Sequence, residues 1–124
     1  MRSRDRTAAE LETRLEQRGV GEAERVQALE TLERIGYVDD ERLARTRAEQ
    51  LAERGSGDAL IRDDLERRGL AADVIELAVG ALEPERERAA RIAGQRGRNV
   101  KTARYLASRG FGEDVLEGLV AMEE

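Results

Sequence analysis

Apolar residues recur every three or four positions along most of the chain, and glycines interrupt this pattern. Three of these interruptions share one motif. In each, a leucine lies four residues before the glycine, an arginine just before it and an apolar residue just after it. The three copies are LEQRGV at 15–20, LERRGL at 65–70 and LASRGF at 106–111. In such a motif the leucine faces the core, the arginine favours the helix C-terminus and the glycine adopts a left-handed conformation. We therefore expect helices to end at Gly19, Gly69 and Gly110.

The spacing of the apolar positions predicts helices throughout and no strand. Thr7 and Glu10 have the spacing of a capping box before the first helix, and Pro84 suits the first turn of a later one. The predicted helices cover about residues 7–18, 22–35, 41–54, 58–68, 73–82, 84–97, 100–109 and 112–121. The chain is therefore predicted to be all-α, with about eight helices.

The three glycine motifs lie 50 and 41 residues apart, which is within the periods of helical repeat arrays. We expect a three-helix repeat at residues 1–55, a second at 56–97 and a partial repeat of two helices at 98–124. Because Gly55-Ser56-Gly57 does not follow a strand, it is interpreted as a flexible joint between the first two repeats and not as a phosphate-binding loop.

A second joint, at residues 36–40, contains one of only two tyrosines in the chain. Gly36 is expected to end the second helix, and Asp39 or Asp40 to cap the third. Tyr37 is expected to pack its ring between these two helices, because a lone aromatic side chain supplies much of the buried area in a thin core. This structural role is preferred over contact with a partner.

Charge is unevenly distributed along the chain. Charged residues make up 40% of the sequence and the net charge is −5, which argues against a protein that coats nucleic acid by itself. Residues 86–109, however, contain seven arginines and Lys101 against the single acid Glu87. Such a segment is typical of a surface that contacts a polyanion or an acidic groove. The alternative is an arginine-rich surface that is merely solvated.

One predicted helix in this segment places a tyrosine within a cationic outer face. Lys101, Arg104, Tyr105 and Arg109 share this face of the helix at 100–109. An exposed tyrosine can stack on a base, although Tyr105 packing on a neighbouring helix is the alternative. The candidate binding residues are Arg62, Arg67, Arg68, Arg96, Arg98, Lys101, Arg104, Tyr105 and Arg109.

Few side chains suited to catalysis are present. The chain has no histidine, no cysteine and one lysine, which excludes a Ser/His/Asp set and zinc held by nitrogen or sulfur. The acids Asp39, Asp40 and Glu41 are consecutive, point in different directions and are better explained by helix capping than by metal binding. We therefore expect that the protein is not an enzyme and binds no metal or cofactor. With no cysteine, secretory signal or long apolar run, a cytoplasmic protein is expected.

Three stretches together resemble the RecX regulatory proteins, which modulate the RecA recombinase. IGYVDDERLA (35–44) resembles the family's Gly-Tyr-Leu-Asp-Asp-x-x-Phe-Ala signature. RGSGDALIRDDLERRGL (54–70) and KTARYLASRGF (101–111) are similar to two further family motifs in the same order and spacing. The chain departs from the pattern at Leu43, Asp58 and Leu60. The family's additional first helix is also missing before Arg2-Ser3-Arg4, which indicates a truncated or short variant.

The resemblance implies tandem three-helix repeats in an elongated, curved rod. It also implies a monomer that binds along the groove of the RecA filament on single-stranded DNA, without a cofactor. Such binding inhibits ATP hydrolysis, strand exchange and coprotease action. Two alternatives remain at this stage: a helix-turn-helix-like module that binds DNA directly, and an adaptor repeat that binds no nucleic acid.

Overall fold

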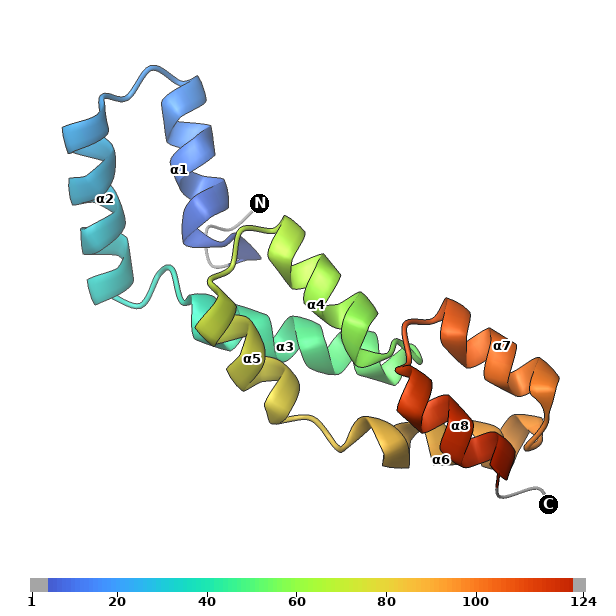
Figure 1. Ribbon diagram of the computed structural model, residues 1–124. Helices are drawn as coiled ribbons and strands as arrows, with labels where there is room; N and C mark the ends of the chain where they lie inside the picture. Colours follow the sequence, from blue (N-terminus) through green and yellow to red (C-terminus); the bar gives the residue numbers. More distant parts are fainter. Residues whose placement is uncertain (1–4, 122–124) are drawn as a thin grey trace.

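A computed structural model describes residues 5–121 of the 124-residue chain. These residues form eight α-helices and no strand, which confirms the all-α prediction (Figure 1). The helices are α1 (Ala8–Gln17), α2 (Glu22–Arg34), α3 (Asp40–Glu53), α4 (Asp58–Arg67), α5 (Ala72–Gly80), α6 (Glu85–Arg96), α7 (Val100–Ser108) and α8 (Glu113–Ala121). Arg2-Ser3-Arg4, before which the sequence lacks the additional helix of the family, lies outside the described residues.

The helix boundaries follow from local capping chemistry. Thr7 and Glu10 form the predicted capping box at the start of α1. After α4, Gly69 has a φ of +81°, and the Leu70 amide donates a 3.3 Å hydrogen bond to the Leu65 carbonyl. The same left-handed turn follows α1 at Gly19 and α7 at Gly110. Pro84 lies one residue before α6, as its N-cap, and not in its first turn.

The helices pack in groups that differ from the predicted repeat boundaries. One buried cluster joins α3, α4 and α5, which we call the middle domain, and a second joins α6, α7 and α8, the C-terminal domain. Helices α1 and α2 form an N-terminal hairpin, and the three groups follow one another along an elongated molecule (Figure 1). The glycine motifs mark where helices end, but the partner of each apolar stripe is decided by packing. Ala44 and Ala48 of α3 are fully buried in the same cluster as Ile61 of α4.

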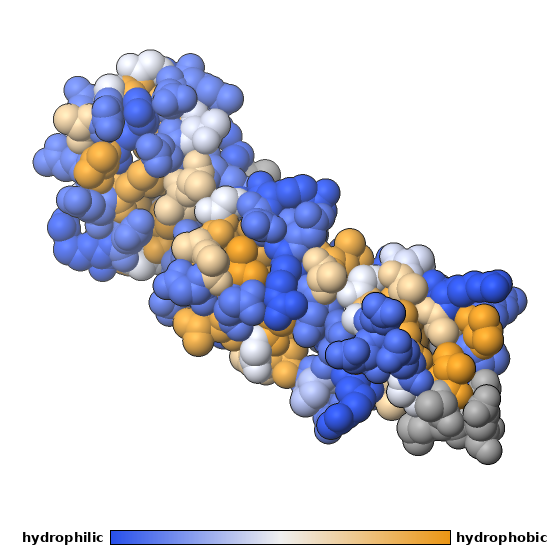
Figure 2. All heavy atoms as spheres, in the orientation of Figure 1, coloured by the Kyte–Doolittle hydropathy of each residue, from blue (hydrophilic) through white to orange (hydrophobic). Residues whose placement is uncertain are grey.

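The hairpin is the least buried group. Helix α2 contains no buried residue, and Val26 on it is 49% exposed. Figure 2 shows apolar atoms reaching the surface over the hairpin, between α1 and α2. Two helices alone bury only part of the apolar stripe that each presents.

Polar contacts hold the hairpin on the middle domain. Arg68 donates two 2.9 Å hydrogen bonds to the Glu10 carboxylate, and the buried Thr7 hydroxyl donates to the Arg68 carbonyl at 2.8 Å. The amide of Ala8 donates to Asp40 Oδ1 at 2.9 Å. The hydrogen bonds from Arg68 hold the pKa of the Glu10 carboxyl below its usual value.

We expect Gly69→Val to lower the free energy of unfolding by about 1–2 kcal/mol, because a β-branched residue is strained at positive φ. An added Cβ also lies 2.7 Å from the Ala9 Cβ, so the hairpin must shift. Thermal unfolding followed by circular dichroism measures the effect. Gly21→Val is the control, since Gly21 has a φ of −65° and no atom within 4 Å of an added Cβ. Equal stability of the two variants contradicts the prediction.

The segment interpreted as a flexible joint is tightly packed, so that interpretation is wrong. Ser56 is 1% exposed, and the Gly57 amide donates a 2.7 Å hydrogen bond to the Arg109 carbonyl. The Ala59 amide donates to the Gly110 carbonyl at 3.2 Å. The sequence suggests flexibility because glycine is locally permissive, but here its lack of a side chain allows two backbones from distant segments to meet.

A buried ion pair completes this joint between the middle and C-terminal domains. Arg88 of α6 is 6% exposed and binds Asp58, the first residue of α4. Its guanidinium also lies 5.8 Å from the centre of the Phe111 ring. The Glu85 carboxylate accepts hydrogen bonds from the amides of Asp58 and Gly112. Side chains of α6 therefore tie the start of α4 to the turn before α8.

Tyr37 does not pack between α2 and α3 as predicted. Its side chain is 44% exposed, whereas the neighbouring Val38 is 3% exposed and occupies the interior of this joint. The predicted cap of α3 is correct, because Asp39 accepts a hydrogen bond from the Arg42 amide. The sequence does not indicate which of Tyr37 and Val38 points inward, because no helical period applies within an irregular joint.

Candidate functional site

Helix α7 presents a cationic face to solvent. Asn99 caps the helix by accepting a 2.9 Å hydrogen bond from the Thr102 amide, while Thr102 and Leu106 are buried on its inner side. Lys101 and Arg104 are exposed on the opposite side. Neither makes an ion pair with any residue that the structure describes. Their charges therefore remain available to an external anion.

Tyr105 is packed within the C-terminal domain, as in the alternative to stacking on a base. Its ring is partly buried against the C-terminal core, and the Arg96 guanidinium lies 3.7 Å from the ring centre. One face of the ring is thus occupied by a cation, which leaves less of it for stacking on a base. The stack instead holds Arg96 beside α7. We call Arg96, Lys101 and Arg104 the basic face.

Two other predicted cations of this region make contacts within the chain. Arg98 is partly buried and interacts with other residues of the chain. Arg109 points its Nη2 atom toward the Arg54 carbonyl at 3.3 Å and the Ser56 hydroxyl at 3.4 Å. The role of Arg109 in the structure is thus to support the packed joint between the domains.

The three predicted arginines of the middle domain are all paired with acids. Arg62 binds Glu76 at 2.9 Å, Arg67 binds Asp63 at 3.0 Å and Arg68 binds Glu10. The hydrogen bond from Arg62 lowers the pKa of Glu76, which matches an ionised carboxylate at that position. The structure does not bring these arginines into the basic face.

The basic segment at residues 86–109 is divided by the fold. Arg88 is buried against Asp58 and Arg91 is paired with Glu83. Arg86, which was not among the predicted binding residues, is exposed and makes no ion pair within residues 5–121. It lines a cavity of about 290 Å³ with Val115 and Leu119 of α8. Arg86 could not be distinguished within the alternation Glu-Arg-Glu-Arg at 85–88, because only the packing of the helices decides which of these charges are neutralised.

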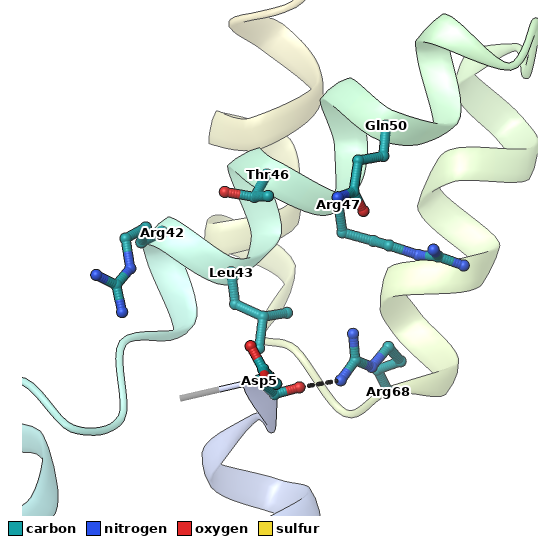
Figure 3. Close-up of a pocket in the computed structure, with 7 residues that line it drawn as sticks. All are labelled: Asp5, Arg42, Leu43, Thr46, Arg47, Gln50 and Arg68. Atoms are coloured by element: carbon teal, nitrogen blue, oxygen red, sulfur yellow. Dashed lines mark hydrogen bonds between the residues drawn. The ribbon is translucent and has the colours of Figure 1, made fainter. Parts of the chain in front are cut away.

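The cavity in Figure 3 lies where the hairpin meets α3 and α4. Its volume is about 380 Å³, and its lining includes Arg42, Arg47 and Arg68. Arg47 is bound through two 3.0 Å hydrogen bonds to Asp64, which lowers the pKa of that carboxyl. Arg68 donates to the Asp5 carbonyl as well as to Glu10, as the dashed line in Figure 3 shows for Asp5. Two of the three cations therefore hold neighbouring elements together. Arg47 joins α3 to α4, and Arg68 joins the end of α4 to the hairpin.

Among residues 5–121, no group of three or more His, Cys, Asp or Glu side chains is arranged to hold a metal ion. No helix in the same range is long and apolar enough to cross a membrane. Three consecutive groups of short helices define an all-α helical-repeat protein.

Comparison with known proteins agrees with this architecture. Residues 39–79, which nearly coincide with the middle domain, match the family described as RecX, second three-helix domain. The fold is similar to the crystal structure of RecX from Lactobacillus salivarius, with a TM-score of 0.78 and 18% identity over 94% of this chain and 84% of that one.

Several similar proteins, including the two that follow, carry the name Regulatory protein RecX. The protein from Deinococcus radiodurans is 35% identical over 89% of this chain and 57% of its own length. The protein from Mycolicibacterium smegmatis is 32% identical over 97% of this chain and 73% of its own length. The chain belongs to the RecX family of regulatory proteins. It spans little more than half the length of the Deinococcus relative.

Proposed function

We propose that this protein regulates a RecA-type recombinase by binding its filament on single-stranded DNA, as a monomer in the cytoplasm and without a cofactor. Binding inhibits ATP hydrolysis, strand exchange and coprotease action. The protein acts by occupying a surface, and it catalyses no reaction itself. The relatives named Regulatory protein RecX support the regulatory role.

The observation that carries the proposal is the contrast between two sets of cations. The candidate arginines of the middle domain are neutralised by acids of the same chain, whereas Lys101 and Arg104 have no such partners among the described residues. Arg96 adds a third charge, supported by the Tyr105 ring. An external polyanion gains most from cations that it does not have to separate from existing partners.

A binding assay with three targets tests the proposal: bare single-stranded DNA, the recombinase alone and the recombinase on single-stranded DNA. We expect the filament to bind most tightly, because it offers phosphates and acidic protein surface together. Equal affinity for bare DNA supports the alternative of direct DNA binding. Binding to none of the three targets contradicts both.

The double reversal Lys101→Glu and Arg104→Glu tests the contact surface. We expect it to weaken filament binding by about tenfold or more and to reduce the dependence of affinity on salt, because two cation contacts become repulsive. Helix content should be unchanged, since both side chains are exposed. Reversal of the exposed Arg14 and Arg18 to Glu is the control with the same change in charge. Unchanged inhibition by the Lys101/Arg104 variant excludes the basic face as the contact.

A further inference from the structure

The joint between α2 and α3 exposes apolar side chains at the surface. Ile35 is 65% exposed and Tyr37 is 44% exposed. The neighbouring helix α2 contains no buried residue, unlike the helices of the two three-helix domains. Exposed large apolar residues concentrated in one place are typical of an interaction site.

A cavity of about 410 Å³ lies at the same joint. Val38 and Val74 contribute apolar surface to it, and its acidic lining residues are Glu33, Asp39, Asp40 and Glu41. The cavity is therefore partly apolar and strongly acidic. This combination matches a lysine or arginine side chain, whose alkyl stem packs on apolar groups while its charged end meets carboxylates.

The charges of these acids are not neutralised within the part of the chain that is described. Asp39 and Asp40 accept hydrogen bonds from the backbone amides of Arg42 and Ala8, and no ion pair involves Glu33 or Glu41. Residues 8–41 contain ten acidic residues and four arginines. Phosphates are repelled by such a surface, and so is a second copy of the same surface.

We propose that this joint surface, formed by Glu33, Ile35, Tyr37, Asp39, Asp40 and Glu41, docks a basic amphipathic segment of a protein partner. A lysine or arginine of the segment enters the cavity, with its stem against Val38 and Val74. Apolar residues of the same segment cover Ile35 and Tyr37. The argument for this occupant is complementarity of charge together with adjacent exposed apolar area. It does not depend on the basic face, which lies in the C-terminal domain.

The probe is a fluorescein-labelled synthetic peptide with leucine and lysine spaced to share one helix face. Its binding is measured by fluorescence anisotropy, without recombinase or nucleic acid. We expect saturable binding that is lost when the lysines of the peptide are replaced by glutamate. Amide chemical-shift changes of the protein should concentrate at residues 33–41. Shifts concentrated elsewhere overturn the proposal.

Matched variants separate this site from general attraction to an acidic protein. Glu33→Gln with Glu41→Gln should weaken peptide binding about fivefold, whereas Glu12→Gln with Glu24→Gln removes the same charge from exposed positions of the hairpin and should have little effect. Ile35→Ser with Tyr37→Ser should also weaken binding, and the exposed Val26→Ser should not. Equal effects of the paired variants overturn the proposal.

Self-association is tested in the same series by sedimentation. If the parent chain forms assemblies that Lys101→Glu with Arg104→Glu abolishes, the occupant of the joint surface is the basic face of a second copy, and the proposed partner is wrong. A monomeric chain that binds the peptide at residues 33–41 supports the proposal. Because recombinase is absent, failure here leaves the proposed function unaffected.

Discussion

Gly57→Ala should lower the free energy of unfolding by about 3–5 kcal/mol, although the new side chain is a single methyl group. A Cβ at Gly57 lies 2.4 Å from the Gly110 carbonyl carbon and 2.5 Å from the Phe111 nitrogen. Both are backbone atoms, so no side-chain rotation relieves the clash. The two segments must separate, which costs the hydrogen bonds from Gly57 and Ala59 at about 1 kcal/mol each in addition to the packing strain.

Urea denaturation followed by circular dichroism measures this loss, and hydrogen exchange of α7 and α8 locates it. The C-terminal domain should exchange faster in the variant than in the parent. Gly94→Ala is the control, because Gly94 lies within α6 and no atom is within 4 Å of its added Cβ. That substitution should stabilise the helix slightly. A Gly57→Ala variant as stable as the parent contradicts the prediction, because the two backbones at the joint can then separate without loss of stability.

Asp58→Ala should destabilise the protein by about 3 kcal/mol or more, because it leaves the Arg88 guanidinium buried without a counter-charge. Arg88 is 6% exposed, and both of its Nη atoms donate to Asp58 Oδ1. Its Nε atom is also buried and has no hydrogen-bond partner in the structure. The Phe111 ring alone does not replace a carboxylate.

The double variant Asp58→Ala with Arg88→Met tests this explanation. Replacing both charges with apolar groups should recover most of the lost stability, since no buried charge then remains unpaired. Arg67→Ala is the surface comparison, because the Arg67–Asp63 pair is largely exposed and its loss should change stability little. If the double variant is as unstable as Asp58→Ala, packing around Asp58 and not the buried charge accounts for the effect.

The sequence by itself determined the helices and their ends. Local chemistry explains this success, because the Thr7 capping box, the Asp39 cap and the left-handed Gly69 depend on residues only a few positions apart. The helical spacing also predicted correctly that Lys101 and Arg104 are exposed on the outer side of α7, because the opposite side of that helix faces the core. Fold class and family motifs could therefore be recognised without coordinates.

Tertiary structure alone decided which helices form a domain and which charges remain unpaired. Two arginines show this. Arg88 is buried at a domain joint, where Asp58, 30 residues away in sequence, pairs with it. Arg104 is exposed, and no described residue brings a carboxylate to it. Gly57 and Tyr37 were misinterpreted for the same reason. The close approach of Gly57 to Gly110 and the exposure of Tyr37 depend on how separate segments are placed in space, and no local pattern of residues encodes that placement.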